Sequence, residues 1–549
     1  MIQVAAVLFV PLVVLPWTVD GVVLPKIALA EALLGSALVF VGARLSRGEV
    51  LRWPRVTALT AVGLALFALS TLASITPALS LTGTYGRWDG LATAVAYLAG
   101  FWVATQTAHD RDLDALTTAI GWSAYVAAVL AIVALFVAAD ATAPGSAFNV
   151  EGSRRAWGVL GNPNALGQFL ALALPISLAA STRNERARSV QAIQVATIAF
   201  ALVMTFSRAS WVAAVLSTML LSVCWLSRGS FGPRLAIRPI AAIAFALIAS
   251  ALLVGPAIWA RIASLPADGS MGLRIAIWTD ALRMVGDRPL LGFGPDSFAL
   301  AYPHYQGGDW AAGSFIDRAH SAPLQVALDS GVPATLGLTA LLVVSVKAAW
   351  SAKTAPAWGV VGALLAYVTA TIGDIVAAPA ATVAFIIAGA ALGTSRVAPR
   401  RPRRPSARLA GIAAAFVAFV VGGLLVTNSV RVLVADITFR ASLERYAQGQ
   451  LSGALDLVSW STRVAPERPE YHALAATYLT ASGQLTLAAA EYGIAVGLGA
   501  TDASIFRRAV DVHVQLGDFD GARALALRAK DLNPFDRESN ELFDRLRGR

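Results

Sequence analysis

Long apolar segments recur through the first 430 residues of this chain, and they are too long for the core of a soluble domain. Hydrophobic residues make up 57% of the 549 residues and charged residues 14%, whereas soluble domains carry about 25% charge. Because a membrane-crossing helix needs about twenty apolar residues, we predict an all-α, polytopic membrane helix bundle with about thirteen spans. The expected spans are 4–19, 22–43, 56–76, 91–107, 115–139, 165–181, 190–206, 209–227, 239–260, 321–346, 357–372, 375–394 and 409–430.

The basic residues indicate an orientation for these spans. They gather in the connections that follow even-numbered spans, and connections rich in Lys and Arg stay in the cytoplasm. We therefore expect a multi-pass protein of the cytoplasmic membrane with its N-terminus inside, and with the segment 261–320 and the C-terminal region outside. The residues concerned are Arg44, Arg47, Arg52, Arg55, Arg183, Arg186, Arg188, Arg228, Arg234, Arg238, Lys347, Lys353, Arg396, Arg400, Arg401, Arg403, Arg404 and Arg408.

Several classes of function are disfavoured by composition. The net charge of +10 comes from these connections and not from a basic patch with interleaved aromatic residues, so we predict no nucleic-acid partner. Met1 to Trp17 has no Lys or Arg and no clear cleavage site, which favours a retained first span over a removable signal peptide. The single cysteine, Cys224, has no partner for a disulfide or a thiolate metal site. Carboxylates in 261–320 are scattered, so we predict neither a metal nor a cofactor.

The polar segment 261–320 is the predicted active-site loop. A polar insert within a lipid-seeking chain requires water, a ligand or both. His320 closes the loop where the next span begins, and its side chain suits proton transfer near neutral pH, so we predict a catalytic role. His304, which has tyrosine neighbours, suits packing within the loop or contact with carbohydrate. The loop gathers Arg274, Arg283, Arg288, His304, Arg318 and His320.

Two arginines are candidate ligands for an anion. Arg208 lies at the outer end of its span, where it either extends to water or projects into a cavity and binds phosphate oxygens. Arg274 lies on the segment 271–285, whose apolar residues recur at the spacing of an amphipathic helix that rests against the membrane or the bundle. Asp280 is expected to pair with Arg283 three residues later, on a solvated face.

Four ionisable residues lie in or beside the apolar segments, namely Asp20, Lys26, Glu31 and Asp374. Ionisable groups at membrane depth are costly and usually functional. For Asp374 we expect a simple turn at the outer surface, between the spans 357–372 and 375–394.

The tail after residue 430 contains a repeat. Gly449, Gly483 and Gly517 are 34 residues apart, which is the tetratricopeptide period. We therefore predict a membrane domain at 1–430 and an extracytoplasmic helical repeat domain at 431–549, which is available to bind a protein partner. Its removal is expected to change acceptor choice or assembly more than the chemical step. The same spacing holds for Ala441, Ala475 and Ala509, for Leu451, Leu485 and Phe519, and for Ala454, Ala488 and Ala522.

Four segments resemble successive signatures of the O-antigen ligase and O-antigen polymerase superfamily. They read GVLGNPNALGQFLALALP (158–175), FSRASW (206–211), LRIAIWTDALRMVGDRPLLGFGPDSF (273–298) and AHSAPLQVALDSGVPATLGL (319–338). The chain departs from the family pattern at Ser321, where relatives often carry Asn, and at Asp329, where they often carry Glu. These departures affect the subfamily and leave the chemistry intact.

The resemblance implies a metal-independent, inverting glycosyltransferase with GT-C-like architecture. Such an enzyme takes a glycan from undecaprenyl diphosphate at the outer face of the cytoplasmic membrane and passes it to an acceptor hydroxyl. By their matching positions, Arg208 and Arg274 would hold the diphosphate, and His320 would take the proton from the acceptor. The membrane lipid and the lipid-linked glycan are the implied partners, with a glycan, a lipid or a protein as acceptor.

The sequence is also consistent with other functions. The first hypothesis is an O-antigen ligase-type role in surface polysaccharide biosynthesis. The alternative is a polymerase of the same superfamily. A polytopic transporter or flippase with a partner-binding repeat domain belongs to a different class, but it would place its polar site near the midplane of the membrane. A noncatalytic tether that uses the repeats as a scaffold is the third possibility.

Overall fold

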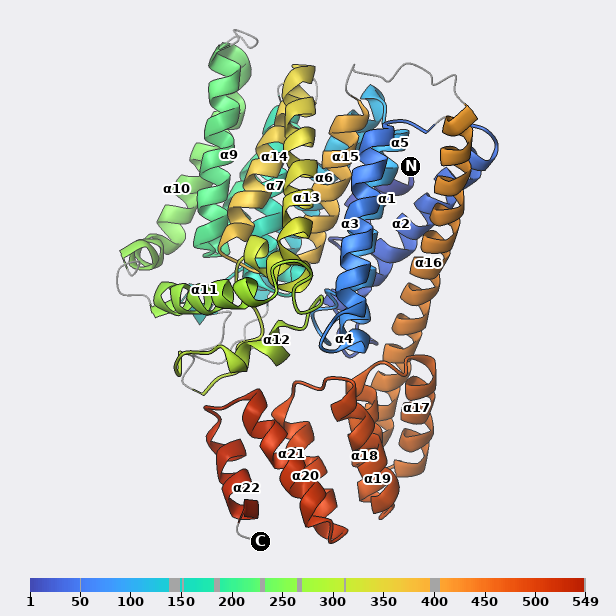
Figure 1. Cartoon of the computed structure of the whole chain (residues 1–549). Helices are drawn as coiled ribbons and strands as arrows, with labels where there is room; N and C mark the ends of the chain where they lie inside the picture. The colour runs from blue at the N-terminus through green and yellow to red at the C-terminus, as the bar shows by residue number, and fades with distance from the viewer. Residues whose placement is uncertain are drawn as a thin grey trace.

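The computed structural model shows a large helix bundle with a smaller helical array at one end (Figure 1). It describes residues 1–49, 51–137, 149–150, 153–181, 188–227, 233–263, 269–310, 313–394 and 405–547. Two antiparallel strands of two residues each, β1 (Asn149–Val150) and β2 (Ser153–Arg154), are the strands among these residues, and the rest form helices, turns and loops. The prediction of an all-α, polytopic bundle is confirmed.

The bundle is built from helices that match most of the expected spans. Within the described residues, eight helices are long and apolar enough to cross a membrane. The count of about thirteen spans stays a prediction. The bundle helices are α1 (Ile2–Phe9), α2 (Val23–Ser46), α3 (Pro54–Leu72), α4 (Pro77–Thr82), α5 (Leu91–Thr107), α6 (Asp110–Val137), α7 (Pro163–Ser181), α8 (Arg188–Met204), α9 (Arg208–Ser227), α10 (Pro233–Ala263), α13 (Ala322–Ala352), α14 (Ala355–Ile372), α15 (Ala378–Gly393) and α16 (Pro405–Ala447).

The first expected span, 4–19, is wrong as a continuous helix. Helix α1 ends at Phe9, so it rises about 12 Å, well short of the roughly 30 Å apolar core of a bilayer. Pro11 and Pro16 follow it, and proline interrupts the hydrogen-bond ladder of a helix. The segment still enters the bundle, because the Gln3 side chain donates a hydrogen bond to the Gly100 carbonyl at 3.1 Å.

Helix α7 lies at the centre of the bundle and is buried over most of its length. It packs against α6, α8, α9 and α14. Its Gln168 donates to the Ile375 carbonyl (2.7 Å) and accepts from the Ala377 amide (3.0 Å). One buried glutamine therefore fixes the turn that joins α14 to α15.

Helix α13 is broken at Gly331, which has φ +82°. A side chain at Gly331 would lie 2.1 Å from the Leu290 carbonyl oxygen, and one at Gly292 would lie 2.2 Å from the Leu328 oxygen. The backbone of the loop therefore lies directly against the backbone of α13 at the break. There the Phe293 amide donates to the Leu328 carbonyl at 2.7 Å. This close approach accounts for Gly292 of the GFGPDS segment, whereas a side chain at Gly294 would lie 2.1 Å from the Ser74 hydroxyl.

The expected amphipathic helix is present as α11 (Gly269–Asp287), which lies across the end of the bundle between α13 and the C-terminal array (Figure 1). Ile277, Ala281 and Met284 are buried on its inner face, whereas Ile275 and Leu282 are more than half exposed. The loop continues through α12 (Phe298–Ala301) and the short helix η2 (Tyr302–His304).

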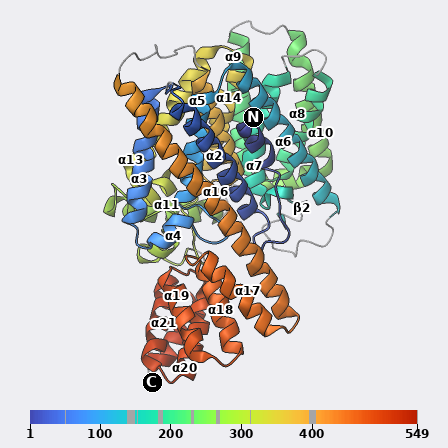
Figure 2. The same cartoon turned by 90° about the vertical axis from the view of Figure 1, so that its right-hand side faces the viewer.

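Helix α16 runs without a break from the bundle into the C-terminal array, as Figure 2 shows. The predicted boundary at 430/431 therefore falls inside a helix. Gly449, Gly483 and Gly517 follow α16, α18 and α20 with nearly equal φ of +76°, +78° and +76°. Assignment of this 34-residue helical repeat to the tetratricopeptide family stays a prediction. The array continues as α17 (Leu451–Val464), α18 (Pro469–Ala481), α19 (Leu485–Gly497), α20 (Ala503–Gln515), α21 (Phe519–Leu532) and α22 (Arg537–Arg547).

Some residues on which the expected orientation depends lie outside the described residues, and the orientation stays a prediction. They are Arg183, Arg186, Arg228, Arg396, Arg400, Arg401, Arg403 and Arg404, together with the loop carboxylate Asp268.

Candidate functional site

His320 lies at the junction between the loop and α13, with its backbone in the left-handed region at φ +49°. A non-glycine residue in this region costs roughly 1 kcal/mol or more and persists where its surroundings hold it. Here Trp278 of α11 donates its indole N–H to the Ala319 carbonyl at 2.9 Å, and the Ala319 amide donates to Gln325 at 3.0 Å. The residue before His320 is thus held from two helices.

The two residues before Ala319 are held by ion pairs. Asp317 accepts hydrogen bonds from Arg87 at 2.6 and 3.0 Å. Arg318 is 3% exposed and pairs with Asp296 at 2.7 Å and with Asp89 at 3.1 Å. Burial alone would lower the pKa of Arg318, but Asp296 and Asp89 raise it above its usual value. These pairs anchor the loop end that carries His320.

The His320 imidazole is suited to accept a proton. Its Nδ1 is buried without a hydrogen-bond partner in the described part of the chain. Burial lowers the pKa of His320 below its usual value, and the positive charge of Arg274 adds to this, although Asp317 opposes it. The ring is therefore neutral near pH 7, which is the form that a general base requires.

Arg274 lies on α11, near enough for its charge to act on His320, and close to the turn after α14. Its Nη1 comes within 4.0 Å of the position that a Gly373 side chain would take. Within the residues that the structure describes, Arg274 forms no ion pair at salt-bridge distance. The neighbouring Asp374 is 6% exposed, and burial raises its pKa against the opposing charges of Arg274 and Arg155.

Arg208 begins α9, directly after a turn in which Phe206 has φ +51°. Its Nε donates to the carbonyl of Arg261, the basic residue in the last turn of α10, at 3.1 Å. Arg155 reaches the same turn, since its Nε donates to the Thr205 carbonyl at 2.8 Å. Burial and the nearby Arg261 lower the pKa of Arg155 to about 10. Arginines from three separate segments therefore meet at this turn.

The match to a known family covers this site. Residues 193–339 match the family model described as O-Antigen ligase. This segment is an O-antigen ligase domain. It contains Arg208, Arg274 and His320, and it confirms the superfamily that the sequence motifs predicted. No curated protein matches the chain.

The O-antigen ligase domain brings some of the predicted site residues together. Arg274 lies near enough to His320 to lower its pKa, whereas Arg208 is linked to Arg261 and Arg155 by the hydrogen bond and charges described above. Two other loop residues lie apart from this group. Arg283 pairs with Asp280, as expected from their spacing, but Asp280 is 2% exposed, so the expected solvated face holds for Arg283 and is wrong for Asp280. His304 is exposed.

Several polar residues of the site were missed in the sequence. Arg87 and Asp89 lie in a short turn before α5, and Arg155 follows β2. Their partners are distant in the chain, so local spacing contains no direct signal for the pairs. The one available hint was the pair of glycines at Gly83 and Gly90, which brackets a run of polar and aromatic residues. Asp374, expected as a simple turn residue, is buried near Arg274.

Proposed function

We propose that this chain transfers a glycan from a polyprenyl diphosphate to an acceptor hydroxyl at the outer face of the cytoplasmic membrane. The observation that carries the proposal is a half-buried histidine whose Nδ1 has no hydrogen-bond partner among the described residues, near an arginine that has no ion pair among them. The O-antigen ligase domain makes a ligase or polymerase the general class of function. The lipid carrier, the acceptor and the roles of single residues are parts of the proposal.

The chemistry is a single displacement with inversion at the anomeric carbon. The acceptor oxygen forms the new bond to that carbon while the bond to the diphosphate oxygen breaks, and the diphosphate leaves with the electron pair. His320 takes the proton of the acceptor hydroxyl. Arg208 and Arg274 bind the phosphate oxygens, because a guanidinium presents a planar fork of donors to such an anion.

This division of roles requires no metal ion. Charge developing on a leaving diphosphate is stabilised when fixed donors face it in a partly dry site. Among the described residues, no cluster of three or more His, Cys, Asp or Glu side chains is placed to hold a cation. We propose that arginine takes the part that a divalent ion plays in many phosphate enzymes, because fixed guanidinium donors can face the developing charge, and transfer should survive a chelator.

The test is transfer by the purified chain. The donor is an undecaprenyl diphosphate-linked glycan extracted from cells that lack this chain, and membranes of the same cells supply the acceptor. We expect His320→Ala to lower turnover by about 10²–10⁴-fold, the usual range for loss of a general base. His109→Ala is the control, because His109 is an exposed histidine in the connection between α5 and α6, outside the loop.

Two results would contradict the proposal, namely full turnover by His320→Ala and loss of transfer on addition of chelator. The product also separates the two members of the class. A single glycan block moved to a different acceptor indicates a ligase, and a lengthened lipid-linked glycan indicates a polymerase.

The proposed orientation has its own test. Reporters fused after Phe315 and at the C-terminus should lie outside the cytoplasm, and one fused after Leu226 should lie inside. A cytoplasmic C-terminus would place the site on the wrong side for an extracytoplasmic acceptor.

A further inference from the structure

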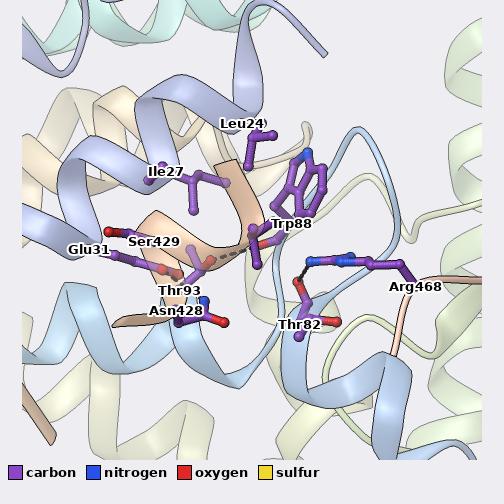
Figure 3. Close-up of a pocket in the computed structure, with 11 residues that line it drawn as sticks. Leu24, Ile27, Glu31, Thr82, Trp88, Thr93, Asn428, Ser429 and Arg468 are labelled. Carbon is purple, nitrogen blue, oxygen red and sulfur yellow. Dashed lines mark hydrogen bonds between the residues drawn. The ribbon is translucent and has the colours of Figure 1, made fainter. Parts of the chain in front are cut away.

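Arg468 extends from the C-terminal array into the membrane domain. It lies between α17 and α18, is 2% exposed, and places its guanidinium 3.9 Å from the centre of the Trp88 ring. The same guanidinium donates to the Gly83 carbonyl at 2.7 Å and to the Thr82 carbonyl at 3.2 Å. Figure 3 shows Arg468 reaching Thr82 with Trp88 beside it. A buried arginine that stacks and donates in this way is a strong, directional contact.

This contact is packed and is not a binding site for a sugar. The cavity beside it, lined by Glu31 and Asn428 among others, has a free volume of about 10 Å³. That is room for about one water molecule. The contact is therefore structural, and the question is what it holds in place.

It holds the turn 83–90, which is stiff. A side chain at Gly83 would lie 2.5 Å from the Asp89 amide nitrogen, and one at Gly90 would lie 2.4 Å from the Gly83 amide nitrogen, so the two ends of the turn touch. Trp88 has φ +60°, and its indole N–H donates to Asp20 at 2.7 Å. A turn closed in this way moves as one body.

The C-terminal array holds this turn at a second point. The Tyr85 hydroxyl donates to Asp436 of α16, to which the Tyr471 hydroxyl also donates at 3.3 Å. The Tyr85 ring lies edge-on to Phe439 and Tyr471, with centroids 6.3 and 6.5 Å away. The array therefore contacts the turn through both Tyr85 and Trp88.

The same turn holds the loop end that carries His320. Arg87, directly before Trp88, pairs with Asp317, and Asp89, directly after it, pairs with Arg318. The neighbouring Thr84 donates through its amide and hydroxyl to Asp296, the second partner of Arg318. A displacement of the turn would thus reach the residues two and three positions before His320.

We propose that Arg468 is a positioning residue for the transfer reaction, acting through the turn 83–90 on the loop that carries His320. The inference rests on the proposed function. It gives the C-terminal array a part in the chemical step, in addition to any partner that the array binds. Displacing a catalytic group by about 1 Å can cost about 100-fold in rate, even when the mutation lies far from the chemistry.

The test compares turnover with donor affinity in the full-length protein. Arg468→Ala should lower kcat by about 10- to 100-fold and leave KM for the undecaprenyl diphosphate-linked glycan within about two-fold, because Arg208 and Arg274 lie outside the displaced segment. Arg468→Lys keeps a cation over the indole and should recover part of the loss. Trp88→Phe keeps a ring under the cation and should fall between wild type and Trp88→Ala.

Arg463→Ala is the matched control, because this arginine of α17 is exposed and makes no contact with the turn. Turnover at the wild-type level in Arg468→Ala would overturn the inference. A loss that Arg468→Lys does not reverse at all, or an equal loss in Arg463→Ala, would also overturn it. His320→Ala, measured in the same assay, tests the proposed function separately, because full turnover by that variant contradicts the base assignment whatever Arg468 does.

Discussion

The arginines of the candidate site fall into two groups that differ in their counter-ions. Arg87 and Arg318 are each paired with carboxylates, and Arg318 is almost fully buried between two of them. Arg274 of α11 has no such pair among the described residues, and Arg208 donates to a backbone carbonyl. The arginines at this end of the bundle therefore divide into Arg87 and Arg318, which pair with carboxylates and hold the loop, and those for which the structure shows no carboxylate pair of this kind.

The largest effect should come from breaking a paired arginine. Arg318→Met leaves Asp89 and Asp296 buried without their cation, and loss of one partner of a buried pair costs about 3–5 kcal/mol. Denaturant unfolding of the purified chain measures this loss. Arg288→Met is the control in the same loop, because Arg288 is exposed and loses only its contact with Phe293, about 1 kcal/mol or less. Equal stability of the two variants would remove the distinction between the groups.

The two arginines that we propose to bind phosphate should show the opposite pattern. Arg208→Lys and Arg274→Lys keep the charge but lose the two-pronged hydrogen bond to phosphate, worth about 1.5–3 kcal/mol. We expect kcat/KM for the lipid diphosphate donor to fall by about 10- to 100-fold while unfolding stays within about 0.5 kcal/mol of wild type. A fall in stability comparable to that of Arg318→Met would place these arginines in the paired group.

A smaller effect should appear in the pH profile. A base must be neutral, so kcat/KM is retained above the pKa of His320 and lost as the pH falls through it. Arg274→Gln removes a positive charge that lowers this pKa, so the pKa should rise and the acid limb should move to higher pH.

Burial also raises the pKa of Asp89, to about 6, but Asp89 is present in both proteins. The difference between the two profiles therefore reports on His320. An acid limb that stays in place, or moves to lower pH, would show that Arg274 does not act on the base.

The helices of the bundle were predictable because each one follows from the pattern of apolar residues within its own segment. Helix α5 begins and ends where the apolar segment does, at 91 and 107, and α11 follows from the spacing of apolar residues within one segment. The break in α13 was not predictable in the same way, because Gly331 needs its conformation for a contact with a loop that precedes the helix. The first expected span is not a continuous helix because Pro11 and Pro16 follow α1. A count of apolar residues does not register this effect of proline.

The candidate site was predictable in part. His320 and Arg274 emerge from the polar loop, and the family resemblance adds the role of Arg208, but these roles stay predictions. The residues that support them were not found. Arg87 and Asp89 are meaningful only through Asp317 and Arg318, which lie some 230 residues later, and Arg468 only through Trp88. Ion pairs between distant segments leave no periodic trace in the sequence, whereas apolar faces do.

Because α16 is unbroken, it fixes the orientation of the C-terminal array about the α16 axis relative to the bundle. Each residue added to a helix turns everything beyond it by about 100° and advances it by about 1.5 Å. One residue inserted between Gly423 and Asn428 would thus swing Arg468 more than a quarter turn away from Trp88. Seven residues would nearly restore the direction but shift the array by about 10 Å. A C-terminal array taken from a relative would therefore have to match the bundle in both its rotation about the α16 axis and its distance along that axis. The array cannot be exchanged without regard to the length of α16.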